Sequence, residues 1–317
     1  MRTITALFVG LGSIGTRHLK NLGNLCADRG WTLQADALRS DLTRPLRPGA
    51  AELLHAQYTD LTAAPAHYDM VFITNPTSLH AEALRQVKGR GEALFIEKPI
   101  FSAEQTGLAL DELLPAGQKA YVAAPMRWCG AMLALKDRLP ALHPYCARVI
   151  CSSYLPDWRP GVDYRTVYSA RKALGGGVTI DLIHEWDYLV ELFGVPEKLY
   201  NFKGTYSELE IDSDDLSVYI AKYPTLLAEV HLDYFGRGYR RSIELFCRDG
   251  SYLADFGKGT LTLPDGTVQH YEEDVNRRYE REMEYFVDYA LTGCGESCNP
   301  PALALKVLKL TLGENVQ

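Results

Sequence analysis

The sequence lacks the features that mark several large classes of protein. Its 317 residues contain seven cysteines but no Cys-x-x-Cys pair, and Cys294 and Cys298, the nearest to a ligand pair, have no second Cys/His pair at zinc spacing. We therefore expect no metal site and reduced thiols. No stretch reaches the roughly 18 uninterrupted apolar residues of a membrane span, and the first residues lack the apolar region and cleavage site of a secretory signal. These absences predict a cytoplasmic protein.

Positive charge is also scarce. Lys and Arg total 33 against 40 Asp and Glu, which gives a formal net charge of −7. This balance argues against binding to nucleic acid or to an anionic membrane, so any phosphate-bearing ligand must be bound by local groups. The apolar share of 47% is that of an ordinary globular protein, and the length predicts about two domains.

Strands and helices alternate in the first part of the chain. Apolar runs predict strands at 4–9, 32–38, 70–74, 93–96 and 120–124, and helical patterns lie between them at 16–25, 78–87 and 103–114. Such alternation predicts a doubly wound parallel sheet with right-handed crossovers. We assign residues 1–122 to a dinucleotide-binding domain of the Rossmann type.

The pattern changes in the rest of the chain. Strand-like runs follow one another at 146–155, 199–206, 216–223, 226–234, 241–249 and 251–256, broken by turn pairs such as Asp265-Gly266. Helices are expected at 132–139, 179–193, 275–291 and 302–312. We therefore predict an α+β domain over 123–317 with a large, mostly antiparallel sheet, whose last helix, about 301–313, is free to pack back on the first domain.

Three glycines follow the first predicted strand. Gly10, Gly12 and Gly15, with Ser13 and Ile14 between them, form G-x-G-x-x-G directly before a helix. Backbone amides and the helix dipole at such a turn can bind a pyrophosphate. We predict dinucleotide binding here.

Two groups compete to recognise the cofactor's ribose. Asp36 has about the usual spacing from Gly15, which favours NAD, whereas Arg39 and Ser40 lie just beyond the second strand, where a cation would meet the 2′-phosphate of NADP. We favour NADP because side chains at the carboxyl end of the strand lie over the cofactor. NAD remains the alternative.

Several further motifs together resemble one known family. They are Thr74-Asn75-Pro76-Thr77 with His80, then Glu97-Lys98-Pro99 after the fourth predicted strand, then Gly175-Gly176-Gly177 leading to Asp181 and His184. In this order they are similar to the glucose-fructose oxidoreductase and inositol dehydrogenase (Gfo/Idh/MocA) family. The resemblance spans both predicted domains.

The resemblance implies an enzyme that moves hydride between a carbinol carbon of a sugar or cyclitol and NAD(P). A neutral histidine suits removal of the hydroxyl proton, so His184 is the proton-transfer candidate. Lys98 would stabilise the developing alkoxide from the carboxyl end of the sheet. Asp181 lies three residues before His184, on the same face of the predicted helix, and would orient a substrate hydroxyl or the imidazole. The family's Asp stands four residues before its His, so this chain departs from the pattern.

The resemblance also implies a set of cofactor contacts. Thr74, Asn75 and Pro76 would lie near the nicotinamide ribose with Glu97, and Arg127 would carry a cation to the ligand. His80 is included in this set, although capping or packing is the alternative for it. For Arg127 the alternative is a structural ion pair.

The segment 155–172 supplies the substrate-binding candidates Trp158, Arg159, Tyr164 and Arg165. Arginines bind phosphate or carboxylate groups and aromatic faces stack on sugars. The segment, with His184-Glu185-Trp186-Asp187, resembles a subgroup associated with bacterial surface sugars and nonulosonic acids, which favours an amino sugar or nucleotide sugar as substrate.

The resemblance implies a homodimer or homotetramer formed through the C-terminal sheet. One alternative function belongs to a different class, because a protein of this fold can bind dinucleotide and sugar as a regulator or sensor without turnover. The presence of Lys98, Asp181 and His184 favours an enzyme.

Overall fold

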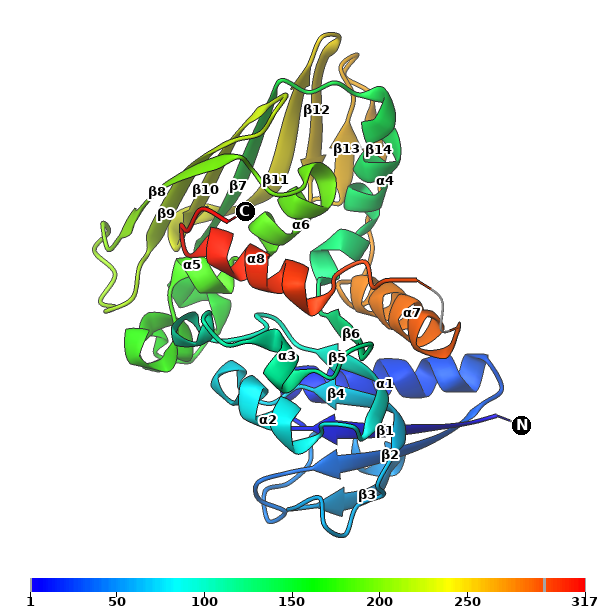
Figure 1. The fold of residues 1–317 in the computed structure, drawn as a ribbon. Coiled ribbons are helices and arrows are strands. Elements are labelled where there is room, and N and C mark those ends of the chain that lie inside the picture. The colour runs from blue at the N-terminus through cyan, green and yellow to red at the C-terminus, as the bar shows by residue number, and fades with distance from the viewer. Residues whose placement is uncertain (1, 293–294, 317) are drawn as a thin grey trace. The chain divides into compact units, whose positions relative to one another are not determined.

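The computed structural model describes residues 2–292 and 295–316, so Cys294 lies outside the described residues. The chain divides into two compact units. Unit 1 comprises the residues up to Ala124 together with Tyr279–Leu305, and unit 2 comprises Pro125–Arg278 with the residues from Lys306 onward. Figure 1 labels the elements of both units. Within the described ranges, no helix is long and apolar enough to cross a membrane.

Unit 1 is built on a parallel sheet of six strands in the order β3-β2-β1-β4-β5-β6. The strands are β1 (Thr3–Val9), β2 (Thr32–Leu38), β3 (Leu54–Tyr58), β4 (Tyr68–Ile73), β5 (Gly91–Ile96) and β6 (Lys119–Val122). Adjacent strands joined through helices confirm the predicted Rossmann-type sheet. Sequence analysis missed β3, a short edge strand whose residues are half-buried or exposed and lack a continuous apolar run.

Four helices accompany this sheet: α1 (Ser13–Asp28), α2 (His80–Gln86), α3 (Leu110–Leu113) and α7 (Asn276–Thr292). The predicted helix at 103–114 is wrong. It is a 3₁₀ turn at Ala103–Gln105, closed by a capping box on Ser102, followed by the single turn α3. Gly107 lies between the two pieces, and glycine disfavours a helix interior by about 1 kcal/mol.

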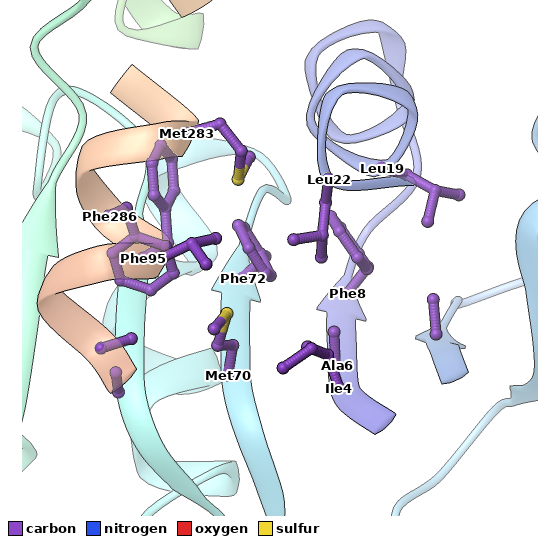
Figure 2. Close-up of a cluster of buried hydrophobic side chains, with 14 of the residues drawn as sticks. Ile4, Ala6, Phe8, Leu19, Leu22, Met70, Phe72, Phe95, Met283 and Phe286 are labelled. Atoms are coloured by element: carbon purple, nitrogen blue, oxygen red, sulfur yellow. The ribbon is translucent and has the colours of Figure 1, made fainter. Parts of the chain in front are cut away.

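The core of unit 1 joins segments far apart in the sequence. Figure 2 shows Met283 and Phe286 of α7 facing the sheet residues Phe72 and Phe95, with Phe8 and α1 beside them. The Phe286 ring stands edge-on to Phe72 and Phe95, with centroid distances of 5.4 and 5.2 Å. Helix α7 therefore completes the hydrophobic core of the dinucleotide-type unit.

Both C-terminal helices contribute to unit 1. We expect the last helix to be free to pack back on the first domain, and unit 1 includes its first residues, Pro301–Leu305, as well as most of α7, which supplies core residues. Helix α8 (Pro301–Thr311) belongs to unit 1 up to Leu305 and to unit 2 from Lys306 onward. Within unit 2 the Thr311 carbonyl accepts a hydrogen bond from the Tyr219 hydroxyl at 2.6 Å.

Unit 2 contains an eight-stranded sheet in the order β14-β13-β12-β11-β7-β10-β9-β8. Only the β10–β7 pair is parallel, which confirms a mostly antiparallel sheet. The strands are β7 (Cys146–Tyr154), β8 (Lys198–Gly204), β9 (Leu216–Lys222), β10 (Leu227–Asp233), β11 (Phe235–Cys247), β12 (Gly250–Asp255), β13 (Thr260–Thr262) and β14 (Val268–His270). The last two, three residues each, were not predicted.

Helices α4 (Gly130–Arg138), α5 (Val178–Asp181) and α6 (His184–Phe193) belong to unit 2. Trp186 of α6 packs edge-on against Tyr219 of β9, and Tyr188 packs against Phe256 beyond β12, with centroid distances of 5.1 and 5.3 Å. Helix α6 therefore covers one face of the sheet. Because side chains alternate along a strand, the neighbours of the buried residues point to the opposite face.

The predicted helix at 179–193 is wrong in one place that matters for the site. It ends at Asp181 and restarts at His184, because Leu182 takes a conformation (φ −99°, ψ 32°) outside the helical region. Asp181 and His184 therefore do not share the face of one helix. The first segment is rich in β-branched residues, which lose side-chain freedom in a helix.

Candidate active site

The glycine turn between β1 and α1 is shaped by close backbone contacts. Gly10 has φ +91°, and a Cβ there would lie 2.8 Å from Asn75 Cα. A Cβ on Gly15 would lie 2.5 Å from the Gly10 carbonyl oxygen. Gly12 differs, because no atom lies within 4 Å of the position its Cβ would take. Two glycines therefore permit the tight turn, and the third leaves open space above the backbone.

The N-terminus of α1 is suited to an anion. No side chain caps the helix and no acidic residue lies in its first turn, so the amides of Ser13, Ile14 and Gly15 have no side-chain partner. Helix N-terminal amides and the helix dipole attract negative charge. Together with the open space at Gly12, these amides fit the pyrophosphate of a dinucleotide.

The carboxyl ends of neighbouring strands lie at the same edge of this sheet. The amide of the residue after a strand donates to the carbonyl of the last residue in the adjacent strand. These hydrogen bonds run from Gly10 to Leu38 at 3.0 Å, from Thr74 to Val9 at 3.0 Å, and from Glu97 to Ile73 at 2.9 Å. The residues that follow β1, β2, β4 and β5 are thereby gathered along one line. Ligands of open parallel sheets bind at this edge.

Asp36 and Arg39 have different surroundings. Asp36 is buried, and its carboxylate accepts a hydrogen bond from the Tyr68 hydroxyl at 2.8 Å and lies 3.1 Å from His55 Nδ1. Burial, and then the bond to Asp36, raise the pKa of Tyr68 far above its usual range, so the phenol remains the donor. Asp36 is thus used within the sheet.

Arg39 follows the last residue of β2 at the ligand-binding edge. Its guanidinium donates to Gln57 Oε1 at 2.6 Å and to the Arg44 carbonyl at 2.5 Å. Both partners are neutral, so the cation is held in place without being neutralised, and the adjacent Ser40 is exposed.

The turn after β4 contributes Thr74 and His80. The Thr74 hydroxyl donates to the Gly10 carbonyl at 2.6 Å and so ties this turn to the glycine turn. His80 is fully buried, with Nδ1 3.1 Å from the Ile100 carbonyl and Nε2 3.0 Å from the Asn75 carbonyl. Burial lowers the pKa of His80 despite these bonds. These contacts fit the packing alternative for His80, which joins the turns after β4 and β5.

Glu97 and Lys98 follow β5. The Glu97 carboxylate is buried, lies 2.6 Å from His18 Nε2 on α1, and accepts the Lys98 amide at 3.1 Å. Burial would raise the pKa of Glu97, but the His18 hydrogen bond, and the charges of His18 and Lys98, outweigh it and hold the pKa below its usual value. Among the described residues, Lys98 Nζ has no hydrogen-bond or ion-pair partner.

In unit 2 the Asp181 carboxylate is enclosed by tyrosines. One oxygen accepts a short hydrogen bond from the Tyr168 hydroxyl, and the other accepts one from Tyr234 at 2.5 Å. Burial, and then the charge of Asp181, raise the pKa of both tyrosines far above the usual range. Asp181 is half-buried at the end of α5, and His184 is half-buried at the start of α6.

The four substrate-binding candidates in the segment between β7 and α5 have different surroundings. Trp158 packs edge-on against Tyr234 at 5.2 Å, and its indole N–H donates to Ser153. Arg165 is engaged by the Asp163 and Glu210 carboxylates, and Tyr164 accepts the Glu210 amide. Arg159 is exposed and has no ion-pair partner within the described ranges.

Arg127 lies in a 3₁₀ turn, Pro125–Trp128, and is buried. It donates two hydrogen bonds to Asp187, at 2.9 and 2.7 Å, and one to Glu191 at 2.6 Å. Burial raises the pKa of Asp187, although Arg127 opposes the rise. The alternative of a structural ion pair therefore describes Arg127 better than a contact with the cofactor.

Sequence reasoning missed three residues of these clusters: His18, Tyr168 and Tyr234 as a partner of Asp181. His18 stands three residues after Gly15, so its position on the glycine-turn helix was visible, but its partner Glu97 is 79 residues away. Tyr168 lies within the segment 155–172, and nothing in the neighbouring sequence indicates that its hydroxyl reaches Asp181.

Comparison with known proteins agrees with this geometry. A family model described as "Oxidoreductase family, NAD-binding Rossmann fold" matches residues 4–123. An uncharacterised oxidoreductase of Bacillus subtilis is 24% identical over 308 residues, which cover 90% of this chain and 86% of that protein. Inositol 2-dehydrogenase of Rhizobium meliloti is 27% identical over 201 residues, which cover 61% and 56%.

Solved structures share the fold across the whole chain. Levoglucosan dehydrogenase, in complex with NADH and levoglucosan, superposes with a TM-score of 0.80 at 16% identity and covers 98% of this chain and 96% of that one. UDP-N-acetylglucosamine 3-dehydrogenase of Acidithiobacillus ferrooxidans has a TM-score of 0.75 at 18% identity and covers 99% and 97%.

The glycine turn, the uncapped helix and the strand-end lysine, taken with these matches, define an NAD(P)-dependent oxidoreductase. Residues 4–123 match the model of the Gfo/Idh/MocA family.

The glycine turn generates a prediction that separates binding from folding. Gly12→Ala should weaken dinucleotide binding at least about tenfold, because the added methyl fills the space left for the phosphates, while the melting temperature stays within about 2 °C. Gly12 has φ −71°, which any residue adopts. Nicotinamide fluorescence titration and thermal melts measure the two effects.

Gly15→Ala is the matched comparison. Its Cβ would meet a backbone oxygen, so the free energy of unfolding should fall by about 1–3 kcal/mol. Unchanged dinucleotide affinity in Gly12→Ala would contradict the assignment of this turn.

Proposed function

We propose that this protein is an NAD(P)-dependent dehydrogenase or reductase acting on a CH–OH group of a sugar, amino sugar or nucleotide sugar. The observation that carries the proposal is Lys98, a half-buried ammonium that has no ion-pair partner among the described residues and follows β5 at the edge where the glycine turn lies. A partly desolvated cation at this edge that is bound by no ion pair among the described residues is suited to a developing alkoxide.

Individual residues have distinct parts in the proposed reaction. When bound, nicotinamide would supply the hydride acceptor or donor. In oxidation, neutral His184 takes the hydroxyl proton while the C–H bonding pair leaves as hydride, and Lys98 stabilises the negative charge on oxygen until the carbonyl forms. Reduction runs the same steps in reverse, with His184 returning the proton.

Asp181 orients the substrate. Its two oxygens are fixed by the hydroxyls of Tyr168 and Tyr234, and each oxygen retains a lone pair for another donor. A hydroxyl beside the reacting carbon is the donor that suits a half-buried carboxylate. Held in this way, Asp181 selects a vicinal diol or amino alcohol over a simple alcohol.

The substrate class follows from the surrounding side chains and the relatives. Relatives named above act on inositol, levoglucosan and UDP-N-acetylglucosamine, all of which are polyhydroxylated. Exposed Trp158 offers a ring on which a sugar can stack. If the substrate carries a phosphate, Arg159 is the better partner, because Asp163 and Glu210 already engage Arg165.

NADP is the favoured cofactor. Asp36, the residue that would favour NAD, is buried and bonded to Tyr68. Arg39 stands at the strand end with neutral hydrogen-bond acceptors and forms no ion pair among the described residues, so its charge is available to a 2′-phosphate.

We also propose that the chain forms a homo-oligomer through the open face of the unit 2 sheet. Strand register places two rows on this face: Tyr200, Ile220, Glu229 and Arg148 in one, and Phe202, Val218, His231 and Ile150 in the other. Phe202 is 73% exposed, and the residues of the rows on β7, β9 and β10 line a hollow of about 520 Å³. A large apolar surface of this kind favours a protein partner, and a second copy is the partner we propose.

The proposed activity predicts a defined loss in His184→Ala. Turnover with NADPH on a panel of free amino sugars, nucleotide sugars, inositol and levoglucosan should appear for the native protein and fall about 10²- to 10⁴-fold in the variant. Cofactor binding, followed by nicotinamide fluorescence, should survive. His270→Ala, an exposed histidine of unit 2, is the control that should keep full activity. Native turnover retained in His184→Ala would remove this residue from the reaction.

The cofactor assignment predicts that Arg39→Ala weakens NADPH about 10- to 100-fold and leaves NADH nearly unchanged, since a charge-assisted hydrogen bond is worth about 1.5–3 kcal/mol. Parallel fluorescence titrations measure both constants. Arg85→Ala, an exposed arginine paired with Glu82, should change neither. Equal weakening of both cofactors by Arg39→Ala would contradict the preference.

The oligomer predicts that Ile220→Asp shifts the native mass toward the monomer, because an unpaired charge in place of an apolar side chain is costly to bury. Sedimentation velocity or light scattering reads the mass directly. Val268→Asp on the distant strand β14 should have no effect. A native protein that is monomeric at micromolar concentration would overturn the proposal.

A further inference from the structure

His18 is a buried residue to which the proposed reaction gives no role. It lies on α1 with its ring packed 4.6 Å from Phe95 and 6.1 Å from Tyr279 between ring centroids. Its Nδ1 has no hydrogen-bond partner among the described residues, so the bond of Nε2 to Glu97 is the polar contact that holds the ring. An apolar side chain would fill this site at lower cost, which points to a function for the imidazole.

Glu97 transmits the effect of His18 to the next residue. One oxygen lies 2.6 Å from His18 Nε2, and the other accepts the amide of Lys98 at 3.1 Å. The carboxylate is therefore fixed at both ends, by the phosphate-binding helix and by the turn that carries Lys98. Glu97 is also the acidic residue nearest to Lys98 in the sequence.

We propose that His18 is a positioning residue that holds the Glu97 carboxylate in place and so sets the geometry and charge of Lys98. This proposal rests on the proposed function in giving Lys98 a role in the reaction. Through this link the helix that binds the cofactor phosphates also fixes the turn that carries the lysine. The effect on Lys98 is measurable in the absence of turnover.

The charged and titratable groups around Glu97 come from four elements. His18 belongs to α1, His80 to α2 and Tyr279 to α7, and Lys98 lies in the same turn as Glu97. The Arg17 guanidinium, also from α1, lies over the Tyr279 ring, 4.5 Å from its centroid. His80 is held neutral by burial, so His18 and Lys98 are the groups that keep Glu97 ionised. Without His18, the Glu97 carboxylate loses the hydrogen bond that fixes it beside the Lys98 turn, and the effect of burial on its pKa is less opposed.

The experiment measures the chemical reactivity of Lys98 Nζ in cofactor-free protein. Reductive methylation at pH 8, quantified by peptide mass spectrometry, reports the reactivity of the amine. His18→Leu and Glu97→Gln should each raise Lys98 labelling about threefold or more, because the carboxylate is no longer held beside the amine in the first variant and its charge is removed in the second. His18→Gln, which keeps an amide donor for Glu97, should restore labelling toward the native value.

The chain offers a matched control. His67 lies 2.9 Å from Glu92 in an exposed histidine–glutamate pair of the same unit, so His67→Leu should leave Lys98 labelling unchanged. The double variant His18→Leu/Glu97→Gln should label like Glu97→Gln alone, because His18 acts through Glu97.

Two results would overturn the proposal: native-level labelling of Lys98 in a folded His18→Leu protein, or additive effects in the double variant. If His18→Leu does not fold, native-level labelling in Glu97→Gln is decisive in the same way. Failure of the proposed function is a separate result. It would be seen as full turnover in Lys98→Met while labelling in the His18 and Glu97 variants still changes as expected.

Discussion

Close approach of three backbones at the glycine turn is the constraint on which the rest of unit 1 depends. Gly10 lies against Asn75, and Gly15 lies against the Gly10 carbonyl, so β1, α1 and the turn after β4 meet with no room for side chains. The Thr74 hydroxyl bonds to the same carbonyl, and His80 carries the connection on to the turn after β5. The glycine turn and the lysine-bearing turn are thus parts of one hydrogen-bonded edge.

Buried charges play the corresponding part in unit 2. Helix α6 begins at His184 and carries Glu185 and Asp187, each bound by a buried arginine. Arg241 of β11 donates to both oxygens of Glu185, at 2.7 and 3.0 Å, and Arg127 does the same for Asp187. Such pairs add little net stability after desolvation, but removing one partner leaves a costly buried charge. Their effect is to fix the rotation and height of the helix whose first residue is the candidate proton acceptor.

Local patterns in the sequence predicted what depends on nearby residues. The three glycines and the strand–turn–helix order were sufficient for the parallel sheet and the tight turn between β1 and α1, because spacing alone determines them. Partners far apart in sequence were not predictable. Nothing near Asp36 indicates that Tyr68 occupies its carboxylate, and nothing near His18 indicates Glu97. Arg127 could be read as a ligand contact or as an ion pair, and only the fold, which brings Asp187 and Glu191 to it, distinguishes the two.

The spacing of Asp181 and His184 illustrates how tertiary contacts replace a local rule. Three residues apart on one helix, they would share a face, but the helix breaks between them, so helical geometry does not orient the carboxylate. Two tyrosine hydroxyls do so instead, Tyr168 from the loop before α5 and Tyr234 from the end of β10. The orientation of Asp181 therefore depends on the loop that carries the substrate-binding candidates. Change in that loop alters how the carboxylate is held as well as what it contacts, which gives this chain a route to its own substrate on a shared fold.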